Sequence, residues 1–488
     1  MKDLRLYNTL NRRIEDFTSI VPQKVGMYIC GPTVYGPPHL GHVRGPIVFD
    51  VFRRLLMQQG YQVRFVRNIT DVGHLVGDAD EGEDKLQKQA RLEQIEPMEV
   101  AQTYTDAYNW AMDALNVLRP SIEPKASGHI IEQIEMIQSI IDANLAYEVN
   151  GSVYFDVEAY QKEHHYGTLS GRVLDDLIAG SASRELEGQS EKRSAHDFAL
   201  WKHALPEHIM QWSSPWGKGF PGWHIECSAM SAKYLGLEFD IHGGGMDLLF
   251  PHHECEIAQS TAAHKHNPAR YWMHHNMITI NGQKMAKSLN NGIQVSALFN
   301  GDHHLLSRGF GPNTLRFFVL QAHYRSTLDF SEVALEGSEK GLKRLLESFK
   351  KLESIVPEKE SNVDIEAVEK AIDSALSDDL NTPIAIAQFF ELAKFINLAV
   401  DKKAALNVQD LEKISNLITV YFQGILGLQT EVEAHSDILD EVMDILITLR
   451  SEAKTDKNYA LSDAIRNRLK EKGVELMDSK EGTTWKHN

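Results

Sequence analysis

The stretch VGMYICGPTVYGPPHLGHVRGPIVFDVFRRLL, residues 25–56, decides the fold of this chain. It opens with an apolar run at residues 25–30, which is typical of a short buried strand. A loop rich in glycine and proline follows at residues 31–42. Apolar residues then return at residues 47–56 with the spacing of one helix face. The stretch therefore predicts a strand, a loop and a helix in direct succession.

The neighbouring residues extend this unit to a second strand. Pro46 is tolerated in the first turn of a helix, and Gly60 fits the position just after the helix ends. Tyr61–Val66 has the pattern of the next strand. A strand–loop–helix–strand unit is the building block of parallel sheets, so we expect an α/β fold. The same pattern resumes at Phe239–Ile241, followed by a predicted glycine loop at His242–Gly245.

The chain divides into several regions. Its 488 residues are too many for one ordinary core and favour two to four domains. We expect an insertion between two halves of the sheet domain at about residues 120–200, with a strand at Val153–Val157 and a polar loop near 180–194. From about Ser331 the pattern becomes one of long amphipathic helices. A small terminal unit with several lysines and arginines follows at about residues 435–488.

Three local signals place the ends of individual elements. Asn281-Gly282, after a predicted strand at Met277–Ile280, is the strongest short signal for a hairpin turn. Thr382-Pro383 predicts a helix start, with the threonine as the capping residue and the proline in the first turn. A further helix is predicted from about His252 to Ala263.

The composition narrows the class of protein. Hydrophobic residues make up 42% and charged residues 24%, which is normal for a globular protein. Met1–Asn11 lacks the apolar core of a signal peptide, and no stretch approaches the ~20 apolar residues that span a bilayer, so we expect a cytoplasmic protein without a membrane partner.

The net charge of -18 argues mildly against a nucleic-acid partner, although the local basic segments matter more than the total. Three cysteines far apart do not indicate a disulfide framework, and metal binding or catalysis is the better use for some of them.

Two short motifs have the residue types that bind phosphate. His39–His42 (HLGH) lies between a predicted strand and a predicted helix, where parallel sheets bind ligands, and its histidines could donate to phosphate oxygens. Lys284–Ser288 (KMAKS) follows the predicted hairpin, and its two lysines could hold a pyrophosphate. Taken alone, each motif is explained at least as well by a solvated turn.

Three segments carry candidate metal ligands. Cys30 ends the first predicted strand, Cys227 lies in a separate segment, and His252 and Glu256 are four residues apart, on one face of a helix. Two thiolates, an imidazole and a carboxylate are plausible ligands for zinc. The alternatives are a buried core cysteine at either position and a surface hydrogen-bonded pair at the other two. Cys255 would point off the ligand face of that helix, so we interpret it as structural.

Together and in this order, HLGH and KMAKS resemble the HIGH and KMSKS signatures of class I aminoacyl-tRNA synthetases. The one departure is Ala286, where that family commonly has serine; we expect it to affect loop motion or rate and not identity. Four further strings resemble cysteinyl-tRNA synthetases in particular, and the resemblance covers nearly the whole chain. They are MYICGPTVY (27–35), WHIECSAM (223–230), HGGGMD (242–247) and PHHECE (251–256).

The resemblance implies an α/β fold of the class I synthetase type. It has a Rossmann-like parallel sheet domain with an inserted domain, followed by a helical bundle and a small C-terminal anticodon-binding domain. The implied divisions are the first half of the catalytic domain (1–120), an inserted connective domain (121–200), the second half of the catalytic domain (201–265), a stem-contact region with the KMSKS-like loop (266–330), the helical bundle (331–430) and the anticodon-binding domain (431–488).

The resemblance also implies the roles of individual residues. One zinc ion is bound by Cys30, Cys227, His252 and Glu256. The catalytic set is His39, His42, Lys284 and Lys287, and the nucleotide is contacted by Gly41, Gly243, Gly244, Gly245, Asp247 and Lys287. Thr70 and Trp223 lie beside the substrate cysteine, although a strand-end hydroxyl and a core aromatic would explain these two as well.

The implied activity is that of a cysteine–tRNA ligase. L-Cysteine and ATP, with Mg²⁺, give cysteinyl-adenylate and pyrophosphate, and cysteine then passes to the 3′-terminal ribose of tRNA(Cys). A free thiol has a pKa near ~8.5 and ionises far more readily than an alcohol, so zinc would select cysteine over serine. Shape alone separates such analogues weakly, and we expect no editing domain. A monomer is the usual form of the family.

Two other functions fit parts of the pattern. A ligase that passes cysteine from the same adenylate to an amino-sugar amine resembles the catalytic half, but it lacks the terminal tRNA-reading domain that is expected here. A zinc-stabilised module without catalysis is favoured only by Ala286. In the terminal segment Trp485 matches the end of the family, where an aromatic ring could stack on an anticodon base, or could simply cap a small core.

Overall fold

A computed structural model describes residues 3–72, 86, 89–90, 95–172, 191–206, 208–286, 289–430, 435–471, 474–479 and 482–487. It divides into two units, Met1–Gln429 and Thr430–Asn488. The predicted loop at 180–194 lies outside these residues except for its last four.

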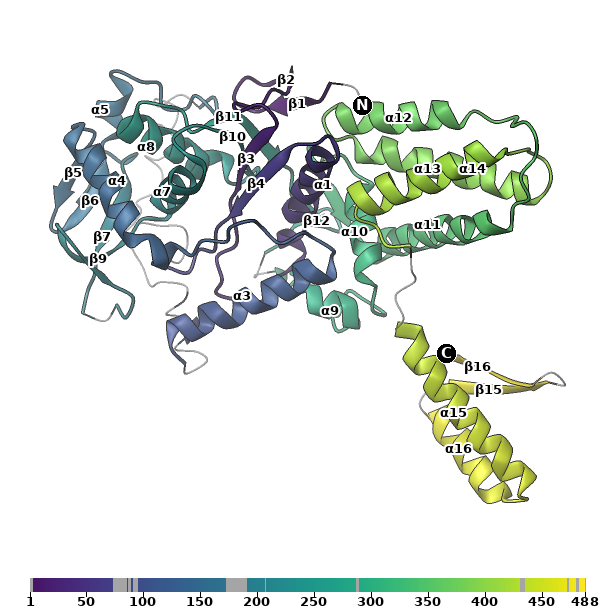
Figure 1. Ribbon diagram of the computed structural model, residues 1–488. Coiled ribbons are helices and arrows are strands. Elements are labelled where there is room, and N and C mark those ends of the chain that lie inside the picture. Colours follow the sequence, from purple (N-terminus) through teal and green to yellow (C-terminus); the bar gives the residue numbers. More distant parts are fainter. Residues whose placement is uncertain are drawn as a thin grey trace. The chain divides into compact units, whose positions relative to one another are not determined.

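A four-stranded parallel sheet forms the centre of the first unit (Figure 1). Its strands, in spatial order, are β11 (Ala269–His275), β10 (Phe239–Gly245), β3 (Lys24–Ile29) and β4 (Gln62–Arg67). Helix α1 (Arg44–Gln58) connects β3 to β4, so the predicted strand–loop–helix–strand unit and the α/β fold class are confirmed.

The sheet is covered by helices on both faces because successive side chains of a strand point to opposite sides. In β3, Met27 and Ile29 join the core that holds the apolar face of α1. Tyr28, between them, joins a second core that holds Cys227 and Met230 of helix α7 (Trp223–Leu235). This alternation places the segment that follows β3 at the junction of the two cores.

One predicted loop is a strand in the structure. His242–Gly245 belongs to β10 and pairs in parallel with residues 272–275 of β11, so its backbone is extended by sheet hydrogen bonds. The glycines are needed for close packing: a Cβ at Gly243 would lie 2.3 Å from a ring carbon of Phe49. The glycine run was interpreted as a loop because its residues have low strand propensity, but here tertiary packing decides.

An N-terminal hairpin precedes this sheet and was not predicted. Its strands are β1 (Arg5–Asn8) and β2 (Arg13–Asp16). The buried Asn8 joins it to β11, because its side chain donates to the carbonyl of Arg270 and accepts from the amide of Trp272. The strands are only four residues long, which is too short for a clear alternation signal.

The insertion contains a five-stranded antiparallel sheet. Its strands are β5 (Ala146–Val149), β6 (Ser152–Phe155), β7 (Phe198–His203), β8 (Trp212–Ser214) and β9 (Gly217–Pro221). The domain boundary predicted at 200 therefore falls inside β7. The strand predicted at Val153–Val157 ends at Phe155, because the Asp156 carboxylate caps the helix that begins at Val157.

The helices around the insertion cover its sheet and the central sheet. They are α3 (Pro97–Ala114), α4 (Ile130–Asp142), α5 (Val157–Gln161), α7 and α8 (Glu254–His264). Helix α8 confirms the helix predicted near residues 252–263, except that His252 lies in the π-helical turn Leu249–His253 that precedes it.

A small three-stranded sheet follows the central one. It consists of β13 (Gln283–Lys284), β12 (Ile278–Ile280) and β14 (Leu328–Phe330). Asn281 and Gly282 form the turn between β12 and β13 with φ of 49° and 77°, as the Asn-Gly pair predicts. The short helices of this region are α9 (Val295–Asn300) and α10 (Pro312–Leu320).

The predicted helical bundle is also present. Its helices are α11 (Glu332–Lys350), α12 (Ile365–Ser377), α13 (Thr382–Val400) and α14 (Val408–Leu417), which continues into a π-helical segment at Ile418–Ile425. Helix α13 begins where Thr382-Pro383 predicts, but the cap is Asn381, whose side chain accepts from the amide of Ile384. The hydroxyl of Thr382 instead donates to the carbonyl of Leu320.

Helix α13 corrects the expectation that no stretch is long and apolar enough to cross a membrane. By length and composition it is one such helix in the described part of the chain. Its buried residues, among them Phe389 and Leu392, pack in the same core as α11 and α12. A core helix of a bundle has the same length and composition as a membrane span.

The second unit is small and has a core of its own. It contains α15 (His435–Thr455), α16 (Tyr459–Glu471) and the hairpin of β15 (Val474–Ser479) and β16 (Gly482–His487). Trp485 pairs with Leu476 across the hairpin and packs against this core. Of the two roles open to Trp485, the structure therefore shows the packing one.

A buried ion pair fastens α1 to the bundle. Nη2 of Arg316 lies 2.6 Å from Oδ2 of Asp50, and both side chains are 1% exposed. The same guanidinium donates to the carbonyls of Leu426, Leu115 and Asn116. The Arg316 guanidinium thus connects α1, the residues that follow α3 and the end of the bundle.

We expect Arg316→Met to lower the free energy of unfolding by about 3 kcal/mol, because it removes one of the two guanidinium groups from the buried Asp50 carboxylate and leaves several buried carbonyls without a donor. Urea unfolding followed by circular dichroism measures the change. The matched control is Arg308→Met, which breaks an exposed pair with Glu339 and should change the same free energy by less than about 1 kcal/mol. Equal losses in the two variants would contradict this prediction.

Candidate active site

The four predicted metal ligands meet in the structure. Cys30 follows β3, Cys227 lies in the first turns of α7, His252 lies in the turn before α8, and Glu256 lies in α8. One ligand atom from each lies within 4.8 Å of all the others. Three segments that are far apart in the sequence therefore converge on one point at the carboxyl end of the central sheet.

The donor atoms of this group are close to contact. The sulfurs of Cys30 and Cys227 are 3.8 Å apart, and Oε1 of Glu256 lies 3.8 Å from the Cys30 sulfur. Nε2 of His252 lies 3.1 Å from the same carboxylate oxygen, as the four-residue spacing predicts. Two sulfurs, a nitrogen and an oxygen in a buried site match the donor set that zinc prefers.

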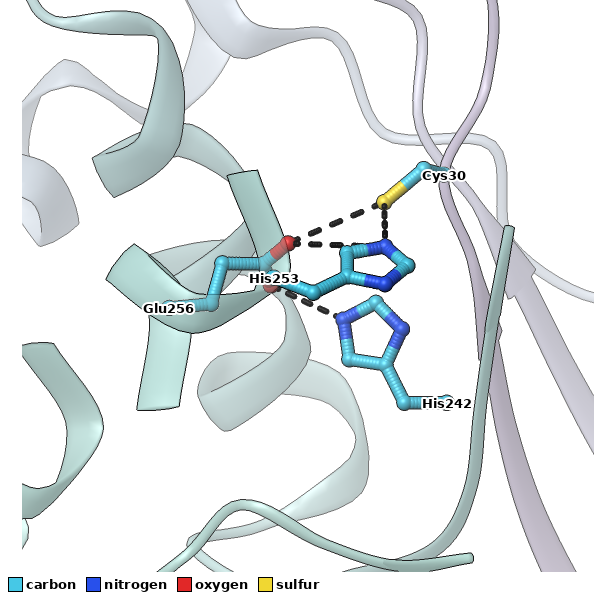
Figure 2. Close-up of side chains that lie close together, drawn as sticks. All are labelled: Cys30, His242, His253 and Glu256. Carbon is cyan, nitrogen blue, oxygen red and sulfur yellow. Dashed lines mark hydrogen bonds and ion pairs between the residues drawn. The ribbon is translucent and has the colours of Figure 1, made fainter. Parts of the chain in front are cut away.

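A second group shares two of these residues. Cys30 and Glu256 also lie within 4.8 Å of ligand atoms of His242 and His253 (Figure 2). Nε2 of His242 lies 2.8 Å from Oε2 of Glu256, and Nε2 of His253 lies 3.3 Å from the Cys30 sulfur. Neither histidine was predicted to belong to the site, although His253 adjoins a predicted ligand and His242 opens the glycine run.

The outer histidines are held by further hydrogen bonds. Nδ1 of His253 lies 2.8 Å from Nε2 of His274, whose Nδ1 lies 2.9 Å from the hydroxyl of Thr9. Nδ1 of His252 lies 2.9 Å from Nδ1 of His224. Such outer partners orient the groups that touch a metal. Their arrangement fits His252 as a ligand and His242 as the residue that orients Glu256.

The electrostatics of the group favour charged ligands. Burial raises the pKa of the Glu256 carboxyl, but His242 and His252 outweigh it and lower that pKa to about 2. Burial lowers the pKa of His252, but Glu256 and Cys227 raise it to about 10. For Cys227, burial is outweighed by the hydrogen bond from Cys30, and its pKa falls to about 6, while burial and Cys227 raise the pKa of Cys30. The site is thus built around a carboxylate and a thiolate.

Cys255 belongs to neither group. It is buried in the core between the insertion and α8, and its sulfur lies 3.4 Å from the hydroxyl of Tyr166. This placement agrees with the prediction that Cys255 is structural.

The HLGH motif forms a compact turn before α1. His39 caps the 3-10 helix Leu40–His42, with its Nδ1 accepting from the amide of Gly41, and Nδ1 of His42 accepts from the amide of His39. The two rings stack with centroids 3.9 Å apart. Because a backbone amide can only donate, both Nδ1 atoms are unprotonated and each neutral ring carries its proton on Nε2. Each histidine can therefore donate to a phosphate oxygen.

The KMAKS motif lies against the HLGH motif. Residues 38–40 and 293–295 exchange backbone hydrogen bonds, and a Cβ on Gly41 would lie 2.9 Å from Cε of Met285. Asn291 accepts from the amide of Ala286 and donates to the carbonyl of Lys284. Lys284 lies on β13 and is exposed, and Lys287 is outside the described residues. The two motifs are therefore neighbours in the parts of both that the structure describes.

A cavity of about 200 Å³ joins these features. It is lined by Cys30 of the metal-ligand group, by Gly41 and His42, by Gly244 and Gly245 at the end of β10, and by Asp247 just after that strand. Gly243 packs against Phe49 instead. Four of the predicted nucleotide-binding residues, Gly41, Gly244, Gly245 and Asp247, thus share one cavity with a predicted metal ligand.

Thr70 and Trp223 lie beside the metal-ligand group. The Trp223 ring centroid is 4.4 Å from that of His252. The buried hydroxyl of Thr70 donates to Oε2 of Glu226 at 2.9 Å. Glu226 was missed in the sequence because it is one of many glutamates and no spacing distinguishes it.

Two family models match this chain. The first, tRNA synthetases class I (C) catalytic domain, matches residues 16–340, and the second, the DALR domain, matches residues 371–431. Among curated relatives, the proteins named Cysteine--tRNA ligase from Bacteroides fragilis and Phocaeicola vulgatus are 56% and 57% identical, with 99% of each chain covered. The protein of that name from Chlorobaculum tepidum is 49% identical, again with 99% of both chains covered.

Solved structures share the fold at low identity. Mycobacterium tuberculosis methionyl-tRNA synthetase in complex with methionyl-adenylate matches with a TM-score of 0.53 and 14% identity, covering 82% of this chain and 89% of the other. The Agrobacterium radiobacter ternary complex of LeuRS with tRNA and LeuAMS matches with a TM-score of 0.56 and 12% identity, covering 84% and 85%.

Proposed function

The chain belongs to the cysteine–tRNA ligase family of class I tRNA synthetases, and on that premise we propose that Cys30, Cys227, His252 and Glu256 hold a zinc ion that gives the site its preference for a thiol. The activity of the family is the ATP-dependent joining of L-cysteine to tRNA. The observation that carries the zinc proposal is the convergence of four donor atoms within 4.8 Å at the end of the cavity that the HLGH motif lines.

The metal would supply selectivity without a separate editing step. A bound zinc ion has high affinity for a thiolate and low affinity for an alcohol, which ionises far less readily. The chain supplies two sulfur ligands of its own and a buried setting, and His242 orients the Glu256 carboxylate through a 2.8 Å contact. Shape alone would separate cysteine from serine weakly.

The HLGH and KMAKS motifs would bind the phosphate groups of ATP during the reaction. The carboxylate of cysteine attacks the α-phosphate of ATP, which enters with Mg²⁺, and pyrophosphate leaves; a terminal ribose hydroxyl of tRNA then attacks the activated carbonyl. No protein nucleophile is needed for either step. His39 and His42 donate from Nε2 to phosphate oxygens, and Lys284 and Lys287 neutralise the charge that builds on the leaving pyrophosphate.

On the nucleotide side of the cavity, glycines allow the protein backbone to approach the nucleotide closely. Gly41, Gly244 and Gly245 leave room beside the phosphates and the adenosine, and Asp247 accepts from ribose hydroxyls. Thr70 and Trp223 enclose the amino acid on the metal side.

The alternative acceptor, an amino-sugar amine, is disfavoured by the rest of the chain. The DALR match at residues 371–431 and the separate unit that follows it are the parts expected to bind tRNA. Purified protein incubated with cysteine, ATP and tRNA should form cysteinyl-tRNA, whereas transfer to an amino sugar alone would refute the proposal. We further propose a cytoplasmic monomer with no membrane partner, which sedimentation and cell fractionation can test.

Removing the metal tests the zinc proposal. Treatment with a zinc chelator, followed by restored Mg²⁺, is expected to abolish cysteine-dependent ATP–pyrophosphate exchange, because the thiol loses its partner. Added zinc should restore the exchange, and metal analysis should then find one zinc ion per chain. Stripped protein that still activates cysteine in preference to serine would contradict the proposed basis of selectivity.

A further inference from the structure

Glu226 carries a buried carboxylate oxygen without a partner. The residue is 0% exposed and lies on α7 directly before Cys227. Its Oε2 accepts from the hydroxyl of Thr70 at 2.9 Å, while its Oε1 has no hydrogen-bond partner among the described residues. An unpaired buried oxygen of this kind is destabilising, so its presence beside a binding site calls for a functional reason.

The hydrogen bonds that lead to Glu226 have a fixed direction. The amide of Gly31 donates to Oδ1 of Asn68 at 2.8 Å, which fixes the orientation of that side-chain amide. Nδ2 of Asn68 therefore donates to the hydroxyl oxygen of Thr70 at 3.1 Å, and the Thr70 hydroxyl donates in turn to Oε2 of Glu226. One lone pair of the Thr70 oxygen remains. Glu226 thus keeps the Thr70 proton occupied, so this hydroxyl can only accept from a further partner.

The Thr70–Glu226 pair lies near the metal-ligand group and next to one wall of the cavity. Backbone hydrogen bonds join Thr70 to Pro32 and Val34, and residues 31–33 line the cavity. Glu226 adjoins the metal ligand Cys227, and Gly31 adjoins the metal ligand Cys30. In cysteine only two carbon atoms separate the nitrogen from the sulfur, so a sulfur at the metal-ligand group places the ammonium beside it.

We propose that Glu226 is a positioning residue that turns the Thr70 hydroxyl into an acceptor for the ammonium group of the amino acid. The proposal rests on the proposed function for the place of the sulfur. It assigns thiol selection to the metal-ligand group and ammonium recognition to the Thr70–Glu226 pair, so the two can be measured separately.

The first test is Glu226→Gln, which keeps the shape but introduces an amide donor that can occupy the remaining lone pair of the Thr70 hydroxyl. The KM for L-cysteine in ATP–pyrophosphate exchange should rise about ten- to a hundredfold, the worth of one hydrogen bond to a charged group. The KM for ATP should stay within about twofold. Thr70→Val should give a similar rise, and the double variant should be little worse than either single one, because the two residues act as a unit.

The second test uses 3-mercaptopropionate, which is cysteine without its amino group. It should inhibit the wild type and Glu226→Gln equally, because neither the thiol nor the carboxylate depends on Glu226. The preference for cysteine over serine should also be unchanged in Glu226→Gln, because both amino acids carry the ammonium. A merely structural role would weaken binding of cysteine and of 3-mercaptopropionate together, and that result would overturn the proposal.

Measuring zinc content separates this proposal from the proposed function. Glu226→Gln should retain one zinc ion per chain. If the variant loses zinc, the rise in KM comes from damage to the metal ligand Cys227 and the proposal is wrong. If the wild type holds no zinc, the zinc proposal fails, while the 3-mercaptopropionate comparison still decides the role of Glu226. The control is Asp197→Asn, another buried carboxyl that accepts from a hydroxyl, that of Tyr147, and it should leave the KM for cysteine unchanged.

Discussion

A Cys227→Ala variant is expected to lose its zinc and at least about a thousandfold of its cysteine-dependent exchange rate. Cys227 supplies one of the four donors and, with its lowered pKa, a thiolate at neutral pH. Losing an outer partner of a metal ligand already reduces affinity or activity about ten- to a hundredfold, and losing a ligand should exceed that. Metal analysis and ATP–pyrophosphate exchange measure the two effects.

The same variant distinguishes the two groups of candidate ligands. If Cys30, His242, His253 and Glu256 held the metal, Cys227→Ala would keep its zinc and His253→Ala would lose it. We expect the reverse, because the group with Cys227 and His252 offers two sulfur donors for zinc, whereas the other group offers one. Cys255→Ala is the matched control, since Cys255 is also buried but lies in neither group; it should keep both the zinc and the exchange activity.

A His42→Ala variant is expected to slow adenylate formation about a hundred- to a thousandfold, the usual effect of removing one donor to developing charge. His42 lines the cavity, and its Nδ1 accepts from the amide of His39, which leaves Nε2 to donate. Burial, with a smaller effect of His39, lowers the pKa of His42 to about 3. The ring therefore stays neutral as the pH falls to about 5, and single-turnover rates should show no loss from its protonation there.

Two further variants separate the donor of His42 from its role in the turn. His42→Asn keeps an acceptor near the amide of His39 but has no group at the position of Nε2, so it should be nearly as slow as the alanine variant. His42→Gln can place its amide nitrogen near that position and should recover part of the rate. Equal activity of the asparagine variant and the wild type would show that the turn, and not the donor, matters.

The sequence was most informative where one pattern had one structural outcome. The helix of residues 47–56, the Asn281-Gly282 turn and the amphipathic helices after Ser331 were all predicted, because each follows from local spacing or from backbone preference. The ligand set was predicted largely by resemblance, since Cys30 and Cys227 are almost two hundred residues apart and no spacing rule joins them.

The rest depends on contacts that no local pattern records. His242 becomes part of the site because β10 pairs with β3 and brings it beside Glu256. Glu226 becomes significant only when α7 places its carboxylate on Thr70. The glycines after His242 form a strand because they pair with β11 and because Phe49 leaves no room for a side chain at Gly243. In each case the deciding partner comes from a distant part of the chain.

The central claim is that zinc binds the thiolate of the substrate. It can be tested by replacing zinc with cobalt and titrating the protein with L-cysteine and L-serine. Thiolate bonds to cobalt absorb light, so each added sulfur ligand increases that absorption. Cysteine should increase the band in proportion to occupancy, and serine should leave it unchanged. Identical spectra with saturating cysteine and serine would contradict the account.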